Sequence, residues 1–265
     1  MILYLSGTGN TKHVAEQIAV ALGERTADVA ETLKGKPAIK LGVGEVLGFC
    51  FPVHGWRPPL LMRNFVRQLS VEAVSPLDSV YCFAVCTAGD TVGEAMDIFA
   101  ADVAEVGINV KAVFDVKMPN TYVGLPFMDV DGKNVEHEKL VASVNRLAFI
   151  TTSVKKKAEG KFLDFVGKWP RINSRFLGEL FVEKLVTDKY FKVDTSLCIR
   201  CGKCAAVCPV SNIKCSKGEH PVWMHNKKCM ACFACYHNCP KHAIQYGWMT
   251  RGKGQYHFCS NIKDK

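Results

Sequence analysis

Two runs of cysteines with the same spacing carry the clearest chemical signal in the sequence. The pattern C-x2-C-x2-C-x3-C-P spans residues 198–209 and returns 31 residues later at 229–240, which indicates an internal duplication. Three thiolates at this spacing can surround one iron–sulfur cubane, and in two-cluster arrangements the fourth cysteine of each run ligates the other cluster. We therefore predict two 4Fe-4S clusters. Cluster 1 is assigned Cys198, Cys201, Cys204 and Cys239, and cluster 2 is assigned Cys229, Cys232, Cys235 and Cys208.

Zinc is the alternative occupant of these sites, since it also accepts four thiolates. Zinc modules usually bring two separated C-x2-C pairs, whereas each run here is a triplet followed by Cys-Pro. Because every cluster has its full set of cysteines, we expect both to carry electrons rather than to bind a substrate. Residues 192–250 are too few for a conventional core, so the clusters themselves should act as the core. This part of the chain resembles the bacterial two-cluster ferredoxins.

A second motif lies near the N-terminus, between an apolar strand-like run and a helix-like stretch. Its members are Ser6, Gly7, Thr8, Gly9, Asn10 and Thr11. A glycine-rich turn that opens a helix presents free N–H groups to an anion. The sequence has neither the dinucleotide pattern G-x-G-x-x-G nor the triphosphate pattern G-x4-G-K-S/T, so this hydroxyl-rich loop suits a terminal phosphate monoester. A plain glycine-rich turn is the alternative.

The same loop resembles the phosphate loop of flavodoxins, S/T-x-T-G-x-T, which holds the phosphate of FMN in that family. Strand-like runs at 46–53, 80–86 and 110–116 alternate with helix-like stretches at 59–69, 91–106 and 135–158. This alternation predicts an α/β fold, a flavodoxin-like doubly wound parallel sheet. In the flavodoxin strand order 2-1-3-4-5, the ligand lies between strands 1 and 3.

Two further loops should then face the phosphate loop. The first contains Pro52, Val53, His54, Gly55 and Trp56, and the second contains Thr87, Ala88, Gly89 and Asp90. Trp56 can stack on a flavin, as an aromatic residue does at this loop in flavodoxins, or it can anchor the loop on the adjacent helix. His54 is either a hydrogen-bonding or proton-donating group or a structural residue. The second flavin face would be covered by the loop at 118–122 or, as we favour, by the ferredoxin-like part.

The charged residues, like the cysteines, are distributed unevenly between the two parts of the chain. Residues 1–150 contain 13 Lys and Arg against 17 Asp and Glu, whereas residues 151–265 contain 21 against 8. Two oxidised clusters at about −2 each and an FMN phosphate at about −2 would offset much of the net charge of +9. The basic excess therefore does not call for a nucleic-acid partner. The positive charge that remains near the linker and the tail favours an acidic redox partner.

The sequence divides into four segments. They are a flavodoxin-like FMN-binding domain at 1–160, an amphipathic helical linker at 161–191, a small α+β two-cluster domain at 192–250 and a basic tail at 251–265 that is either mobile or a docking segment. No apolar run approaches the roughly 20 residues of a membrane-spanning helix, and no export signal precedes the first strand, so we expect a cytoplasmic protein. Cys215 and Cys259 lie outside both cysteine runs and receive no role.

The whole chain resembles a family of flavodoxin–ferredoxin fusions found in anaerobes, because the phosphate loop and both cluster motifs occur in that order. The resemblance implies an oxygen-sensitive electron-transfer protein in which two 4Fe-4S clusters and a bound FMN link a ferredoxin-type donor to a partner acceptor. A flavin-dependent reductase of a small organic substrate is the alternative, with His54, Asp90 and Tyr122 as catalytic candidates. A regulatory module that responds to cluster oxidation is a third interpretation, and a homodimer stays open.

Overall fold

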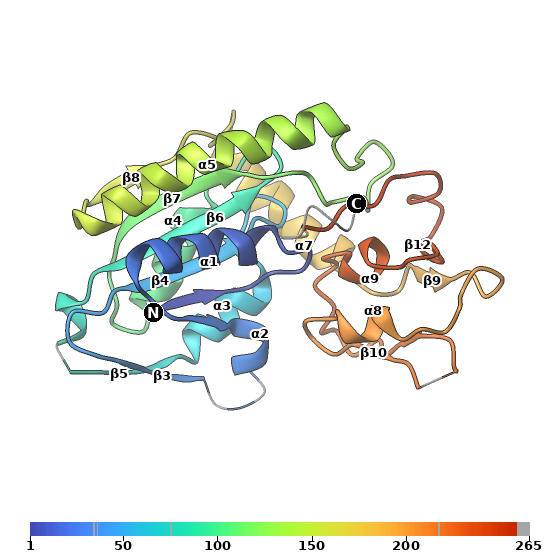
Figure 1. The fold of residues 1–265 in the computed structure, drawn as a ribbon, viewed down its shortest axis with the longest axis horizontal. Helices are drawn as coiled ribbons and strands as arrows, with labels where there is room; N and C mark the ends of the chain where they lie inside the picture. Colours follow the sequence, from blue (N-terminus) through green and yellow to red (C-terminus); the bar gives the residue numbers. More distant parts are fainter. Residues whose placement is uncertain (34, 36, 75, 217, 259–265) are drawn as a thin grey trace.

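A parallel sheet forms the centre of the N-terminal part (Figure 1). The computed structural model describes residues 1–258 apart from 34, 36, 75 and 217. Among these residues, six parallel strands form one sheet in the order β2-β1-β4-β6-β7-β8. They are β1 (Ile2–Tyr4), β2 (Thr26–Asp28), β4 (Leu47–Pro52), β6 (Cys82–Ala88), β7 (Val110–Lys117) and β8 (Gly160–Phe162). The first five reproduce the order 2-1-3-4-5, so the predicted flavodoxin-like sheet is confirmed.

Helices cover both faces of this sheet (Figure 1). α1 (Asn10–Leu22) and α5 (Lys133–Lys155) pack on one face, whereas α3 (Leu60–Arg67) and α4 (Ala95–Ala104) pack on the other. The central strands are apolar along nearly their whole length because they are buried on both sides. Alternate side chains serve the two layers, so Phe83 faces α1 and α5 while Phe49 faces α3 and α4.

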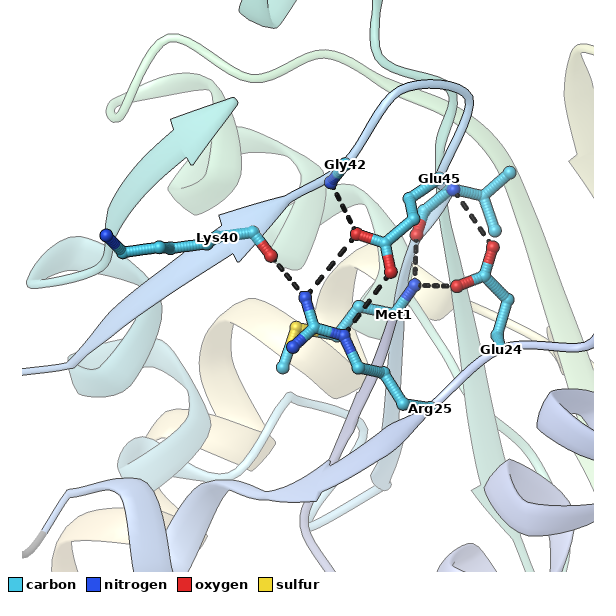
Figure 2. Close-up of polar contacts among 7 residues, drawn as sticks. Met1, Glu24, Arg25, Lys40, Gly42 and Glu45 are labelled. Atoms are coloured by element: carbon cyan, nitrogen blue, oxygen red, sulfur yellow. Dashed lines mark hydrogen bonds and ion pairs between the residues drawn. The ribbon is translucent and has the colours of Figure 1, made fainter. Parts of the chain in front are cut away.

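A polar network closes the sheet at the end opposite the strands' carboxyl termini (Figure 2). The amino group of Met1 pairs with Glu24 and donates to the carbonyl of Val46 at 2.5 Å. Arg25 pairs with Glu45 at 3.3 Å, and Glu45 also accepts the N–H of Gly42 at 2.6 Å. The neighbouring short elements are α2 (Val29–Thr32), the parallel pair β3 (Ala38–Leu41) and β5 (Ser70–Ala73), and the 3-10 turn η1 (Leu77–Ser79).

The chain that leaves α5 forms a strand that the sequence pattern does not predict. β8 pairs with β7, so residues 160–162 belong to the sheet, although the sequence-based division ends the first domain at 160 and begins the helical linker at 161. Three residues are too short to show the period-two pattern of a strand. The fully buried carboxylate of Asp115 fixes the segment that follows, because it accepts the N–H groups of Asp164 and Phe165 at 2.8 Å each.

The linker continues as a helical segment that lies against the loop after β4. It consists of α6 (Pro170–Ile172), a π-helical turn η2 (Asn173–Leu177) and α7 (Gly178–Leu185). The packing is close, since a Cβ atom on Gly178 would lie 2.2 Å from the carbonyl oxygen of Gly55. Only glycine at position 178 allows this approach, and it places α7 beside a loop that the sequence assigns to the cofactor site.

The C-terminal part is built on the duplicated cysteine motif. Each cysteine triplet leads into a one-turn helix, α8 (Lys203–Ala206) or α9 (Ala234–His237), and then into a short strand, β10 (Ile213–Lys214) or β12 (Ile244–Tyr246). β10 pairs antiparallel with β11 (Val222–Trp223), and β12 pairs antiparallel with β9 (Phe191–Val193). A small cysteine-rich α+β unit therefore follows the sheet, as predicted.

This small unit has an apolar core of its own, which the sequence analysis did not anticipate. The rings of Phe191, Phe233 and Tyr246 are buried and lie within 5.3 Å of one another, centroid to centroid. Val123, from the loop after β7, packs into the same cluster. The expectation that iron–sulfur clusters alone act as the core is therefore incomplete, because large aromatic rings let a short segment bury much apolar area. No helix among the described residues is long and apolar enough to cross a membrane.

Candidate functional site

A cavity of about 260 Å³ lies at the carboxyl ends of β1, β4 and β6. This is the edge at which a doubly wound sheet binds its ligand. Every residue that the sequence predicts for cofactor binding lines the cavity except Gly9, and all three catalytic candidates line it as well. The strand order thus brings the three predicted loops together, although Thr11 of the first and Thr87 of the last are 76 positions apart.

The phosphate loop lines this cavity with Ser6, Thr8 and Thr11. It leads into α1, whose first turn contains no acidic residue, so the positive end of the helix dipole is unopposed. The Ser6 hydroxyl accepts the N–H of Gly9 at 3.2 Å, and Gly9 adopts the left-handed φ of +96° that starts the helix. The hydroxyls of Thr11 and Thr87 are buried and lie 2.7 Å apart. Hydroxyls and free helix N–H groups fit a phosphate monoester, as the sequence predicts.

The C-terminal tail crosses this loop and explains why Gly9 does not reach the cavity. The N–H of Phe258 donates to the carbonyl of Thr8 at 2.8 Å, and a Cβ atom on Gly9 would lie 3.0 Å from Phe258. The buried Tyr256 hydroxyl donates to the side-chain oxygen of Asn10 at 2.9 Å. The described tail residues therefore contact the phosphate loop of their own chain. Cys259 lies outside the described residues.

The loop after β4 forms the wall on which a flavin ring would lie. Trp56 has a left-handed φ of +58°, and its indole N–H donates to the hydroxyl of Thr91 at 2.9 Å. The loop is tight, because a Cβ atom on Gly55 would lie 2.7 Å from the Phe181 ring of α7. Burial lowers the pKa of His54 to about 4, so this histidine is neutral at pH 7 and can donate one ring N–H or accept at the other nitrogen.

The loop after β7 forms the opposite side of the cavity. The Asn10 amide donates to the carbonyl of Pro119 at 2.9 Å, which ties this loop to the phosphate loop. The Tyr122 ring packs edge-on against Phe181 and Phe233, both at 5.3 Å between centroids. Its hydroxyl is buried without a hydrogen-bond partner among the described residues, and burial raises its pKa. An orphaned hydroxyl beside a cavity is the kind of group that a bound ligand would satisfy.

The cluster-2 cysteine loop closes the cavity over the phosphate loop. Met230, Ala231, Cys232 and Phe233 line the same cavity as the three flavodoxin-like loops. A Cβ atom on Gly7 would lie 2.7 Å from the Cβ and 3.1 Å from the Sγ of Cys232, so the absence of a side chain at Gly7 lets the two loops touch. Of the two covers considered from the sequence, both the 118–122 loop and the ferredoxin-like part contribute to the wall.

His237 joins the cluster-2 loop to its neighbours. It is 2% exposed; one ring nitrogen lies 2.7 Å from the Thr121 carbonyl, and the other accepts the N–H of Tyr256 at 3.1 Å. This pairing requires the neutral ring, and burial accordingly lowers the pKa of His237 to about 4. The histidine therefore fastens α9, the loop after β7 and the tail to one another.

The four cysteines assigned to cluster 1 surround a separate hollow. Cys198, Cys201, Cys204 and Cys239 line it together with Cys215, and the described residues that line it all come from the range 198–244. The N–H of Ala243 donates to the sulfur of Cys239 at 3.2 Å. Such N–H to sulfur bonds are typical of iron–sulfur ligands. Among the described residues, no three His, Cys, Asp or Glu side chains converge tightly enough to hold a single metal ion.

The cluster-2 cysteines show the same kind of surroundings. The N–H of Asn212 donates to the sulfur of Cys208 at 3.3 Å, and the N–H of Ala231 donates to that of Cys229 at 3.4 Å. Burial raises the pKa of Cys229 to about 12 and that of Cys232 to about 11. Iron must therefore displace the protons from these thiols when the clusters form.

Sequence reasoning missed several residues that line the cavity, most of which come from segments distant from the predicted loops. They include Phe181 and Val186 of the linker, Leu125 and Met128 after β7, and Thr91. The linker residues lie in the apolar helical pattern of 161–191. That pattern indicated that one face of the linker is buried, but not which surface of the protein it packs against. No local signal in the sequence pairs α7 with the loop after β4.

Comparison with protein-family models identifies one part of the chain. A family model described as a 4Fe-4S dicluster domain matches residues 190–240. No curated protein matches the chain. Among solved structures, a short-chain flavodoxin associated with a bacterial microcompartment is 14% identical, with 60% of this chain and 97% of that one covered and a TM-score of 0.34.

Two other solved structures are similar to part of the chain. A flavodoxin from Streptococcus pneumonia is 16% identical, with 56% of this chain and 97% of that one covered and a TM-score of 0.31. A flavone reductase is 13% identical, with 66% and 69% covered and a TM-score of 0.36. The fold assignment rests on the strand order rather than on these values. The chain thus joins a flavodoxin-like parallel sheet to a dicluster domain whose eight cysteines imply two 4Fe-4S clusters, a combination that indicates electron transfer.

Proposed function

We propose that the protein passes electrons between two 4Fe-4S clusters and an FMN bound in the cavity at the carboxyl edge of the sheet. One observation carries the proposal: Cys232, a ligand assigned to cluster 2, lines the cavity and touches Gly7 of the phosphate loop. A cluster held by Cys232 would border the cavity that a flavin would enter if its phosphate occupied the loop. We also propose, as the sequence analysis predicts, that the protein is cytoplasmic and that it works under anaerobic conditions.

The residues of the chain divide the work of holding and orienting the cofactors. Ser6, Thr8 and Thr11 and the first N–H groups of α1 would bind the phosphate. Trp56 would stack on the ring, while Thr91 fixes the indole by accepting its N–H. The flavin would supply chemistry in steps of one or two electrons, which matches clusters that transfer one electron at a time. Phe181 and Phe233 line the same cavity, and their apolar rings would limit the access of water to a bound flavin.

The experiment that tests the proposal is anaerobic photoreduction of the reconstituted holoprotein. The clusters should become reduced, and the flavin absorbance should then bleach in an intramolecular step whose rate does not depend on protein concentration. Flavin binding itself is checked by quenching of FMN fluorescence on titration with the iron-loaded protein. A protein that binds no FMN, or whose bound flavin stays oxidised beside reduced clusters, would contradict the proposal.

A flavin-dependent reductase is the second candidate, and the Tyr122 hydroxyl favours it. This buried hydroxyl has no partner among the described residues and borders the cavity, so it could donate a hydrogen bond or a proton to a substrate above the ring. Tyr122→Phe should then abolish most turnover of an organic acceptor while cluster-to-flavin transfer stays unchanged. Equal turnover by both proteins would remove this candidate.

A further inference from the structure

The cluster-1 site opens to solvent, unlike the cluster-2 site. Of the eight assigned ligands, all of them described, Cys201 is the exposed one. The hollow that it borders is lined by residues between 198 and 244, with no described residue of the flavodoxin-like sheet among them. Cluster 1 is therefore the cofactor that a protein arriving from solution can reach.

The side chains around this opening form one surface, here called the cluster-1 face. It consists of Leu197, Ile199, Arg200, Lys203 and Lys241, all exposed. The two apolar members are large and open to water, with Leu197 at 49% and Ile199 at 56% exposure. The three basic members border the cluster-1 hollow itself. An apolar centre flanked by charged residues is the usual composition of a protein-binding patch.

The positive charge of this region exceeds what the clusters neutralise. Residues 189–245 contain nine Lys and Arg against two acidic residues, Asp194 and Glu219. Two oxidised clusters at about −2 each leave the segment at roughly +3. Asp194 is also engaged locally, because its carboxylate accepts both the N–H and the hydroxyl of Ser196. The cluster-1 face thus stays positive in the loaded protein, and it attracts a negatively charged partner.

Arg200 is held in place on this face. Its guanidinium donates to the carbonyl of Gly218 and to the ring of His220, each at 3.3 Å. A fixed charge costs less side-chain entropy when a partner binds than a free one does. The arrangement favours docking of a protein with an acidic surface over loose attraction of small ions.

We propose that an acidic electron-carrier protein docks on the cluster-1 face and reduces cluster 1. The proposal rests on the proposed function, since it names the partner that feeds the same relay. In the docked complex, the reduced iron centre of the partner would give up one electron and become oxidised, and a cluster held by Cys198, Cys201, Cys204 and Cys239 would accept it; no bond forms and no proton moves. Because Cys232 lines the cavity, the cluster-2 ligands would hold their cluster where the electron can pass on to a bound flavin as the final acceptor.

The test compares two donors on the FMN-loaded, iron-loaded protein under anaerobic conditions. The first donor is a reduced acidic plant-type 2Fe-2S ferredoxin, and the second is photoreduced 5-deazaflavin, a small molecule that needs no docking. The double variant Arg200→Glu/Lys203→Glu should lower the second-order rate with the ferredoxin by about tenfold or more at low salt and flatten its dependence on ionic strength. The rate with deazaflavin should stay within about twofold.

A charge-matched control is available far from both clusters. Lys155 and Lys156 are exposed at the end of α5, so Lys155→Glu/Lys156→Glu changes the net charge equally without touching the cluster-1 face. This control should retain the rate of the unaltered protein with the ferredoxin. Iron content and cluster absorbance of both variants report whether either has lost a cluster.

The proposal is supported if Arg200→Glu/Lys203→Glu lowers the rate with ferredoxin and leaves the rate with deazaflavin unchanged. Equal ferredoxin rates for the two double variants would overturn it. So would a result in which Arg200→Glu/Lys203→Glu abolishes binding of duplex DNA or anionic vesicles but leaves the ferredoxin rate unchanged. Failure of the proposed function is seen separately, because the unaltered protein reduced by deazaflavin would then leave its flavin oxidised.

Discussion

The two copies of the cysteine motif have the same spacing but different surroundings. The first copy encloses a hollow that opens to solvent beside Arg200 and Lys203. The second copy lies against the phosphate loop, and its Cys232 lines the cavity at the edge of the sheet. The duplication therefore supplied two equivalent sets of cysteines, and the neighbours of each set determine whether it faces solvent or the cavity at the edge of the sheet.

Removal of one ligand from each copy should break this equivalence most strongly. Cys232→Ala should lose cluster 2 and weaken FMN binding by about tenfold or more, because the same residue shapes the flavin cavity. Cys201→Ala should lose cluster 1 and leave the FMN dissociation constant within about twofold. Iron analysis and FMN fluorescence titration measure both effects. Equal weakening of FMN binding in the two variants would show that the copies do not differ in their relation to the cavity.

A methyl group at Gly7 should separate the cluster-2 loop from the phosphate loop. Gly7→Ala places a Cβ atom 2.7 Å from that of Cys232, so we expect a loss of about 1–3 kcal/mol in stability and slower transfer between cluster 2 and the flavin. Gly132→Ala is the matched control, since no described atom lies within 4 Å of the added group and its φ is an ordinary −64°. Urea unfolding and photoreduction kinetics report the two effects, and identical behaviour of both variants would contradict the contact.

The C-terminal tail should affect how tightly the cavity holds FMN and should not affect the cluster-1 face. Tyr256→Phe removes the hydrogen bond to Asn10, which at about 1 kcal/mol corresponds to roughly fivefold faster FMN release. Tyr190→Phe, at a residue 44% exposed, should leave the release rate unchanged. Stopped-flow FMN release into excess apoflavodoxin measures both rates. An unchanged rate for Tyr256→Phe would mean that the tail does not hold the phosphate loop in its binding form.

The smallest expected effect is a pH dependence that originates in the flavin cavity. Burial lowers the pKa of His54 to about 4, so the unfolded chain binds a proton more readily than the folded chain. The resulting stability is complete above a pH of about 6.5 and is lost as the pH falls toward 4. Between pH 7.5 and 5.5, His54→Gln should reduce the decline in unfolding free energy by about 1 kcal/mol. Urea unfolding at each pH measures the decline, and parallel pH profiles of the unaltered protein and the variant would contradict this.

The sequence was sufficient for the parts of the molecule that depend on local pattern. Strand and helix periodicity predicted the parallel sheet, and its topology placed the loops that contain Thr8, Trp56 and Asp90 at one edge. The duplicated spacing predicted the two cysteine sets. Closure of the cavity could not be predicted, because contacts such as Gly7 with Cys232 or Asn10 with Tyr256 join residues more than 200 positions apart and leave no periodic signal. β8 was missed because it is only three residues long.

We expect cluster 2, and not cluster 1, to lie next to a bound flavin. An anaerobic crystal structure of the FMN-loaded protein, with the iron atoms located by anomalous scattering, would measure both distances. It should show an FMN phosphate on residues 6–11, a ring in the cavity beside Trp56, and the irons bound by Cys229, Cys232 and Cys235 closer to the ring than any iron of cluster 1. A flavin closer to the irons bound by Cys198 and Cys201, or a cavity that takes no flavin, would contradict it.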